Sequence, residues 1–268
     1  TPFVDPSSQI LGPAEYEKAS QTLDELKAST VPINDPIDLA ARLGGKPNVP
    51  DVVIDTEAPY SVGDQKTFWA TNTDTTDNFQ VKATLHYVGD NIYFWIEDGV
   101  RFDQTDLNNL AETFDKEIIP TNREFFGEEW NPGVDGDPRF YILYAGNLGT
   151  DLAGYYSSAD ELHPDAHPYS NAHEMFLISS DNVDLGDSYI YGTMAHEFQH
   201  MIHWYQAKNE ETWVNEGFSM LAEHVNNYDA GGFDWSYMDN TDMQLNDWGG
   251  DIGDNGPHNG ASYLFMVY

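Results

Sequence analysis

The sequence contains no cysteine, and this absence excludes several kinds of site. Disulfide bonds, cysteine-ligated zinc and thiol nucleophiles all need that side chain. Basic residues are scarce as well, since 11 Lys and Arg stand against 46 Asp and Glu, for a formal net charge of −35. A surface of this sign repels phosphate groups, so we expect no nucleic-acid partner and no binding to anionic lipid as the main activity.

Long hydrophobic runs are also absent. No apolar stretch approaches the ~18 residues of a membrane span, and no signal-peptide pattern follows Thr1. The last residues, GASYLFMVY (260–268), have the apolar spacing of a helix that stops without a cap. We therefore expect no membrane span, and we interpret the chain as a piece of a longer protein.

The order of the periodic segments predicts an α+β protein with a packed core, which 268 residues and 14% aromatic content can supply. Strand-like runs lie at 79–88, 91–100, 139–146 and 174–180. Helical periodicity covers 16–28, 37–43, 106–126 (with a kink expected at Pro120), 189–207 and 210–227.

We divide the chain into three parts on this pattern. Residues 1–58 are an N-terminal arm or leader remnant, and residues 59–207 are a β-containing subdomain that ends in a helix. Residues 208–268 are a mainly helical subdomain that we expect to be incomplete at its C-terminus.

The stretch HEFQH within the helix at 189–207 carries the chemistry. His196, Glu197 and His200 form the pattern H-E-x-x-H. Positions i and i+4 of a helix lie one turn apart on one face, so both imidazoles can reach one metal ion. Glu197 projects beside them, where it can take a proton from a metal-bound water.

A catalytic zinc site needs a third protein ligand and one open position. The metzincin extension of the motif requires a glycine at position 203 and a histidine at position 206, but the chain has His203 and Gln206. The alternative is a glutamate from the following helix. Glu216, in TWVNEGFSMLAEH (212–224), stands at the start of an apolar helical pattern and provides it.

HEFQH followed by WVNEGFS resembles the glutamate zincins, the superfamily of thermolysin and the zinc aminopeptidases, and is most similar to the hyicolysin-like secreted metallopeptidases. The resemblance covers 195–224, with weaker support from GASYLF. It implies a zincin-like α+β fold, Zn²⁺ bound by His196, His200 and Glu216, and Glu197 as the general base.

The chain departs from this family in two ways, the first being that only 15 residues separate His200 from Glu216, which requires a short connection between the two helices. The acidic residue that orients a zinc-binding histidine in thermolysin-like sites falls four residues after the glutamate ligand, where this chain has Met220. We expect Ser219 or Glu223, on about the same helical face, to orient a histidine instead. The resemblance also implies an oxyanion donor within 255–265, for which His258 and Tyr263 are the candidates.

The remaining histidines and acidic loops predict less. His163, His167 and His173 have an irregular, Pro-broken spacing, so we interpret them as ordinary loop residues, and His203 as a packed or solvent-facing side chain. Loops at 134–138, 181–187 and 247–256 offer oxygen ligands for a structural Ca²⁺ but lack the EF-hand spacing. Solvated Asp-Gly turns explain these loops better on so acidic a chain.

The sequence therefore predicts a secreted, monomeric, zinc-dependent endopeptidase that acts on protein or peptide substrates outside the cell. The strand MFLIS (175–179) is the edge along which we expect an extended peptide to bind. No G-x-M-E-N-like segment of the kind that anchors a free amine is present, which favours internal cleavage. The alternative is a non-catalytic acidic surface or calcium-binding protein on a zincin scaffold, which predicts no hydrolysis.

Overall fold

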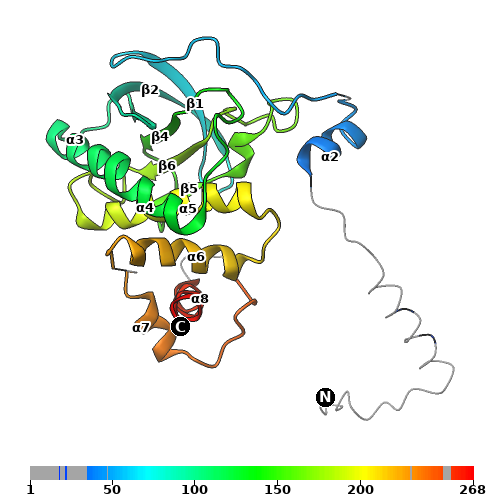
Figure 1. The fold of residues 1–268 in the computed structure, drawn as a ribbon, viewed down its shortest axis with the longest axis vertical. Helices are drawn as coiled ribbons and strands as arrows, with labels where there is room; N and C mark the ends of the chain where they lie inside the picture. The colour runs from blue at the N-terminus through cyan, green and yellow to red at the C-terminus, as the bar shows by residue number, and fades with distance from the viewer. Residues whose placement is uncertain (1–17, 19–21, 23–34, 47, 230, 250–254) are drawn as a thin grey trace. The chain divides into compact units, whose positions relative to one another are not determined.

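One mixed β-sheet organises the part of the chain that the computed structural model describes, which comprises Lys18, Thr22 and residues 35–46, 48–229, 231–249 and 255–268. The sheet order is β1-β2-β3-β4-β6-β5 (Figure 1). Its strands are β1 (Gln65–Thr71), β2 (Asn78–Val88), β3 (Ile92–Glu97), β4 (Phe140–Ala145), β5 (Gly154–Tyr156) and β6 (Met175–Ser179).

The type of strand pairing changes twice across the sheet. β1, β2 and β3 are antiparallel neighbours, β3, β4 and β6 run parallel, and β5 is antiparallel to β6 at the sheet edge. The four predicted strand segments are confirmed. The prediction that MFLIS is the edge strand is wrong, because β6 lies between β4 and β5, and it is β5 that leaves one side unpaired.

The central strands are buried on both faces, which is why they read as continuous apolar runs. On β3, Ile92, Phe94 and Ile96 belong to the core that packs against the helices. Tyr93 and Trp95, which alternate with them, belong to an aromatic core on the opposite face. The sheet therefore separates two hydrophobic cores, and the helices that carry the functional residues lie on the first.

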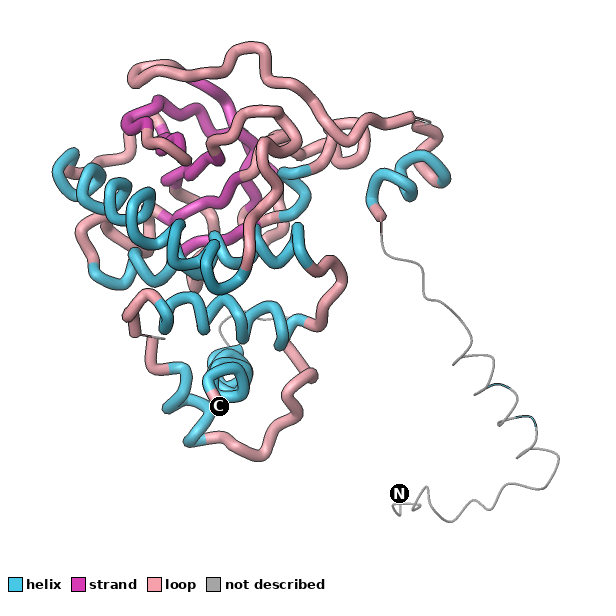
Figure 2. Tube along the Cα trace, in the orientation of Figure 1, coloured by secondary structure: helices cyan, strands magenta, loops and turns pink. Residues whose placement is uncertain are grey.

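Helices lie before β1, in the connection between β3 and β4, and after β6, where they alternate with loops, as Figure 2 shows. They are α2 (Pro36–Arg42), α3 (Gln104–Thr113), α4 (Ile119–Phe126), α5 (Ser188–Gln206), α6 (Thr212–Val225), α7 (Phe233–Asp239) and α8 (Gly256–Val267). This arrangement confirms the α+β fold class and is consistent with a zincin-like fold. The helix expected at 16–28 lies outside the described residues except at Lys18 and Thr22, and the boundaries at 58 and 207 stay predictions.

The helix expected at 106–126 is present but is not simply kinked at its proline. A π-helical segment (Phe114–Ile118) joins α3 to α4. Pro120 falls in the first turn of α4, where a missing N–H costs least. α7 was not predicted, because Gly and Asp residues surround it.

Packing of the helices prepares the functional site. α5 packs against β5 and β6, α6 packs against α5, and α8 packs against both α6 and α7. Figure 1 shows α6, α7 and α8 as a layer on the far side of α5 from the sheet. Within the described residues, no helix has both the length and the apolar character needed to cross a bilayer.

Candidate active site

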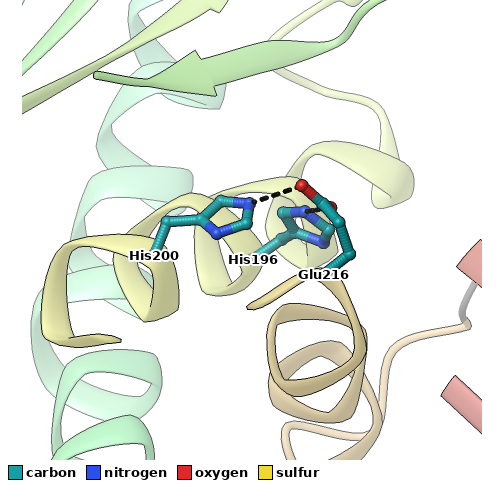
Figure 3. Close-up of side chains that lie close together, drawn as sticks. All are labelled: His196, His200 and Glu216. Carbon is teal, nitrogen blue, oxygen red and sulfur yellow. Dashed lines mark ion pairs between the residues drawn. The ribbon is translucent and has the colours of Figure 1, made fainter. Parts of the chain in front are cut away.

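Three candidate ligands from two helices converge on one point, as Figure 3 shows. The Nε2 atom of His196 lies 3.3 Å from Oε2 of Glu216, and Nε2 of His200 lies 3.7 Å from Oε1 of Glu216. Their ligand atoms all lie within 4.8 Å of one another, and no other such group of three was found among the described residues. The structure thus brings together the three predicted ligands.

The pattern of apolar residues on α5 explains which way the histidines face. Met194, Phe198 and Met201 are fully buried in the core beside the sheet. That burial turns the opposite face of α5, with His196 and His200, towards α6. His203 is 7% exposed with its ring 5.8 Å from that of Phe218, so the prediction of a packed side chain is confirmed.

Hydrogen bonds from α6 fix the orientation of both imidazoles. Nδ1 of His196 donates to Oε1 of Glu223 at 2.8 Å. Nδ1 of His200 lies 2.9 Å from both Oδ1 of Asn215 and Oγ of Ser219. The sequence left Ser219 and Glu223 as alternatives, and the structure shows that each contacts a different histidine. Asn215 was missed, because a neutral amide carries no motif signal of its own.

These hydrogen bonds leave the Nε2 atom of both rings free to bind a cation. A histidine that donates through Nδ1 keeps its lone pair on Nε2, which is the atom that faces Glu216. Two neutral imidazoles and one carboxylate form the donor set of catalytic zinc sites, which also keep a position open for water. The residues present therefore fit a divalent metal of the zinc type.

The electrostatics of the three groups favour positive charge at the point where they meet. Burial alone would lower the pKa of His196, but hydrogen bonds to Glu216 and Glu223 raise that pKa well above its usual value. Burial would likewise raise the pKa of Glu216, yet His200 and His196 hold it at about 2. A proton or a metal cation is thus stabilised between them.

Glu197 lies next to this group and is 6% exposed. Burial raises its pKa above the usual value for a glutamate, while the neighbouring His196 and His200 oppose part of that shift. A carboxylate with a raised pKa accepts a proton near neutral pH more readily than a solvated one. Its position and its environment both suit a general base.

Two cavities flank the three ligands. The first, of about 340 Å³, is lined by His196, Glu197, His200 and Glu216 together with β5, its preceding loop, and residues near α7 and α8. The second, of about 450 Å³, shares Tyr156, His200 and Glu216 with the first and continues past Trp204 and Glu210. His200 and Glu216 therefore border both open spaces, His196 borders the first, and the edge strand β5 contributes to the walls of both.

The two candidate oxyanion donors lie elsewhere in the structure. The hydroxyl of Tyr263 is 2.9 Å from Nδ1 of His224, and the ring of His258 packs 5.4 Å from that of Trp248. Neither residue lines either of the two cavities. From the same segment, 255–265, the cavity wall instead includes Asn255 and Asn259.

The acidic loop at 134–138 is not a solvated turn, which corrects the sequence interpretation. Asp135 is 1% exposed and Asp137 is 8% exposed. Asp135 pairs with Nδ1 of His173 at 2.6 Å, and Asp137 accepts a hydrogen bond from the Tyr93 hydroxyl at 2.9 Å. His173 is therefore a buried, paired residue rather than an ordinary loop histidine.

Comparison with known proteins agrees with the metal-site geometry. No protein-family model matches the chain. The neutral metalloprotease ShpI of Staphylococcus hyicus is 30% identical over 183 residues, an alignment that covers 61% of this chain and 40% of that protein. The chain is similar to a known metalloprotease. It spans 40% of the length of that relative.

Proposed function

We propose that this protein is a zinc-dependent endopeptidase of the glutamate-zincin type. The observation that carries the proposal is the convergence of His196, His200 and Glu216, with Glu197 beside them, on the wall of an open cavity. The similarity to a neutral metalloprotease supports a metal-dependent peptidase. We further propose that it acts outside the cell and as a monomer.

The chain's own residues supply what the reaction needs besides the metal. Zinc, when bound, lowers the pKa of a coordinated water to about 7 and polarises the scissile carbonyl. Glu197 accepts the proton as the water oxygen adds to the carbonyl carbon. Glu197 then returns that proton to the amide nitrogen, so that the C–N bond breaks to give a carboxylic acid and an amine.

Internal cleavage is supported by the space on both sides of the ligands. A substrate cut in mid-chain must extend in two directions from the scissile bond. The two cavities meet at Tyr156, His200 and Glu216, and both are bordered by the C-terminal end of β5. The unpaired side of β5 offers backbone hydrogen bonds to an extended peptide, which is how strand addition works.

The experiment that tests the proposal compares the wild type with Glu197→Gln. We expect stoichiometric zinc in both by metal analysis, and cleavage of casein and of a peptide with blocked ends by the wild type alone. Glu112→Gln, which changes an exposed glutamate on α3, is the matched control and should keep full activity.

The outcomes separate the proposal from its rival. Zinc in both proteins with hydrolysis in neither would support a non-catalytic protein on a zincin scaffold. No zinc in either, or equal hydrolysis by wild type and Glu197→Gln, would contradict the proposed site itself.

A further inference from the structure

Asn259 lies on α8 and contributes to the wall of the first cavity, to which β5 also contributes. The residue lines the cavity together with His196, Glu197 and Glu216. Its Oδ1 atom is buried and has no hydrogen-bond partner among the described residues. Asn255, on the same wall, differs: its carboxamide pairs with the backbone of Gly249 at 3.1 and 3.3 Å.

An unpaired amide beside a cavity has a physical cost. A buried polar group without a partner costs roughly 1–3 kcal/mol, so such groups are rare and usually have a ligand or a water to meet. Asn259 contributes to the cavity wall while its oxygen is enclosed. Nδ2 is not among the buried, unpaired side-chain atoms of the described residues, so it is the polar atom of this side chain that can meet a ligand in the cavity.

The backbone around Asn259 is held closely in place. A Cβ atom on the next residue, Gly260, would lie 1.9 Å from the carbonyl oxygen of Phe233. Only glycine allows α8 to approach the start of α7 so closely. Phe233 itself lines the cavity, so this contact fixes the wall that carries Asn259.

A peptide bound along β5 needs a partner on its other side. An extended chain directs backbone N–H and C=O groups to both of its edges, and β5 can satisfy only one of them. Residues of α8 line the same cavity as β5, and α8 is therefore the element that can meet the opposite edge of such a peptide. We propose that the Asn259 carboxamide donates a hydrogen bond through Nδ2 to a backbone carbonyl oxygen of the bound peptide, and so positions the scissile bond at the metal. This inference rests on the proposed peptidase function.

The first test is steady-state hydrolysis of a blocked peptide by the zinc-loaded Asn259→Ala variant. We expect kcat/KM to fall roughly 10- to 100-fold, the range for loss of a hydrogen bond in an enclosed site. Asn259→Asp, which keeps the shape but loses the donor, should lose as much, and Asn259→Gln should recover part of the activity. Asn246→Ala, which removes an exposed carboxamide outside the cavity, should match the wild type.

Two inhibitors separate positioning from a structural role. Acetohydroxamate needs only the metal, so its affinity should stay unchanged in Asn259→Ala. A peptide phosphonamidate also uses the peptide-binding contacts, so its affinity should fall along with kcat/KM. Equal loss for both inhibitors, or for neither, would overturn the inference. Zinc content and thermal unfolding of each variant confirm that the fold is retained.

The test also separates failure of this inference from failure of the proposed function. If the wild type hydrolyses peptides and Asn259→Ala does so equally well, the inference fails and the function stands. If the zinc-loaded wild type hydrolyses nothing, calorimetric binding of the phosphonamidate decides instead. Weaker binding to Asn259→Ala then supports the contact, and equal binding, or no binding to either protein, overturns it.

Discussion

Two histidine–carboxylate pairs of the same chemistry lie in very different places in this molecule. His196 donates through Nδ1 to Glu223 at 2.8 Å, and His173 pairs through Nδ1 with Asp135 at 2.6 Å. The His173 side chain is 4% exposed and its ring stacks 4.0 Å from that of Tyr141. The His196 side chain is 17% exposed and lines a cavity.

The difference shows that the pair alone does not make a functional site. What distinguishes His196 is its second nitrogen, which meets His200 and Glu216 beside open space. The second nitrogen of His173 lies 4.0 Å from Asp55, and both side chains are buried. Burial lowers the pKa of His173, whereas the carboxylates around His196 raise its pKa despite burial.

The largest expected effect comes from removing the histidine of the His196–Glu223 pair. His196→Ala removes one of three ligands, so we expect loss of bound zinc and a decrease in kcat/KM of at least ~10³-fold. Stability without metal should fall as well, because Glu223, which is 6% exposed, loses its His196 partner. Metal analysis, peptide hydrolysis and urea unfolding in EDTA measure these quantities. Full zinc content in the variant would contradict the ligand assignment.

His173→Ala removes the histidine of the other pair, His173–Asp135. It leaves the buried Asp135 carboxylate without the hydrogen bond from the imidazole, which costs roughly 1–3 kcal/mol of unfolding free energy or more. Zinc stoichiometry in the folded protein should be unchanged. Urea unfolding measures the loss, with His163→Ala in the same loop as the control, since that ring only accepts a local hydrogen bond from the Asp165 amide. A variant as stable as the wild type would show that the buried pair contributes nothing.

Glu223→Gln weakens the His196–Glu223 pair but leaves the candidate ligand His196 in place. A glutamine oxygen still accepts the Nδ1 hydrogen bond but carries no charge, so the imidazole becomes a weaker ligand. We expect zinc affinity to fall roughly 10- to 100-fold, the usual range when a group that supports a ligand is changed. Competition with a chelating dye measures the affinity, with Glu112→Gln as the control. An unchanged affinity would make the Glu223 contact incidental.

The smallest expected effect is the pH dependence that the buried pair imposes. The folded pKa of His173 is lowered, so below about pH 6.5 the unfolded chain binds a proton that the native state excludes. The titration of His173 therefore lowers the free energy of unfolding as pH falls below about 6.5. Above that pH it adds no pH dependence. The difference in urea midpoint between wild type and His173→Gln, measured from pH 7.5 to 5 with zinc present, isolates this contribution. A difference that does not vary with pH would contradict it.

The same contrast explains how much the sequence could predict. His196 and His200 were predicted from spacing along one helix, Glu216 from its place on the next helix and from the family resemblance, and Ser219 and Glu223 only as alternatives on one helical face. The His173–Asp135 pair joins positions 38 residues apart, and no local pattern connects them. The edge strand β5 was missed because three residues are too few to show alternation. Local order was thus predictable, whereas contacts set by the sheet topology were not.

The division of the ligands between α5 and α6 has a consequence for the lifetime of the molecule. An ion bound there joins the helix on the sheet to the layer of α6, α7 and α8, so its binding free energy also opposes local opening between them. Loss of the ion removes that restraint. Under the proposed peptidase function, a copy without its metal is therefore both inactive and more easily cleaved by copies that retain it.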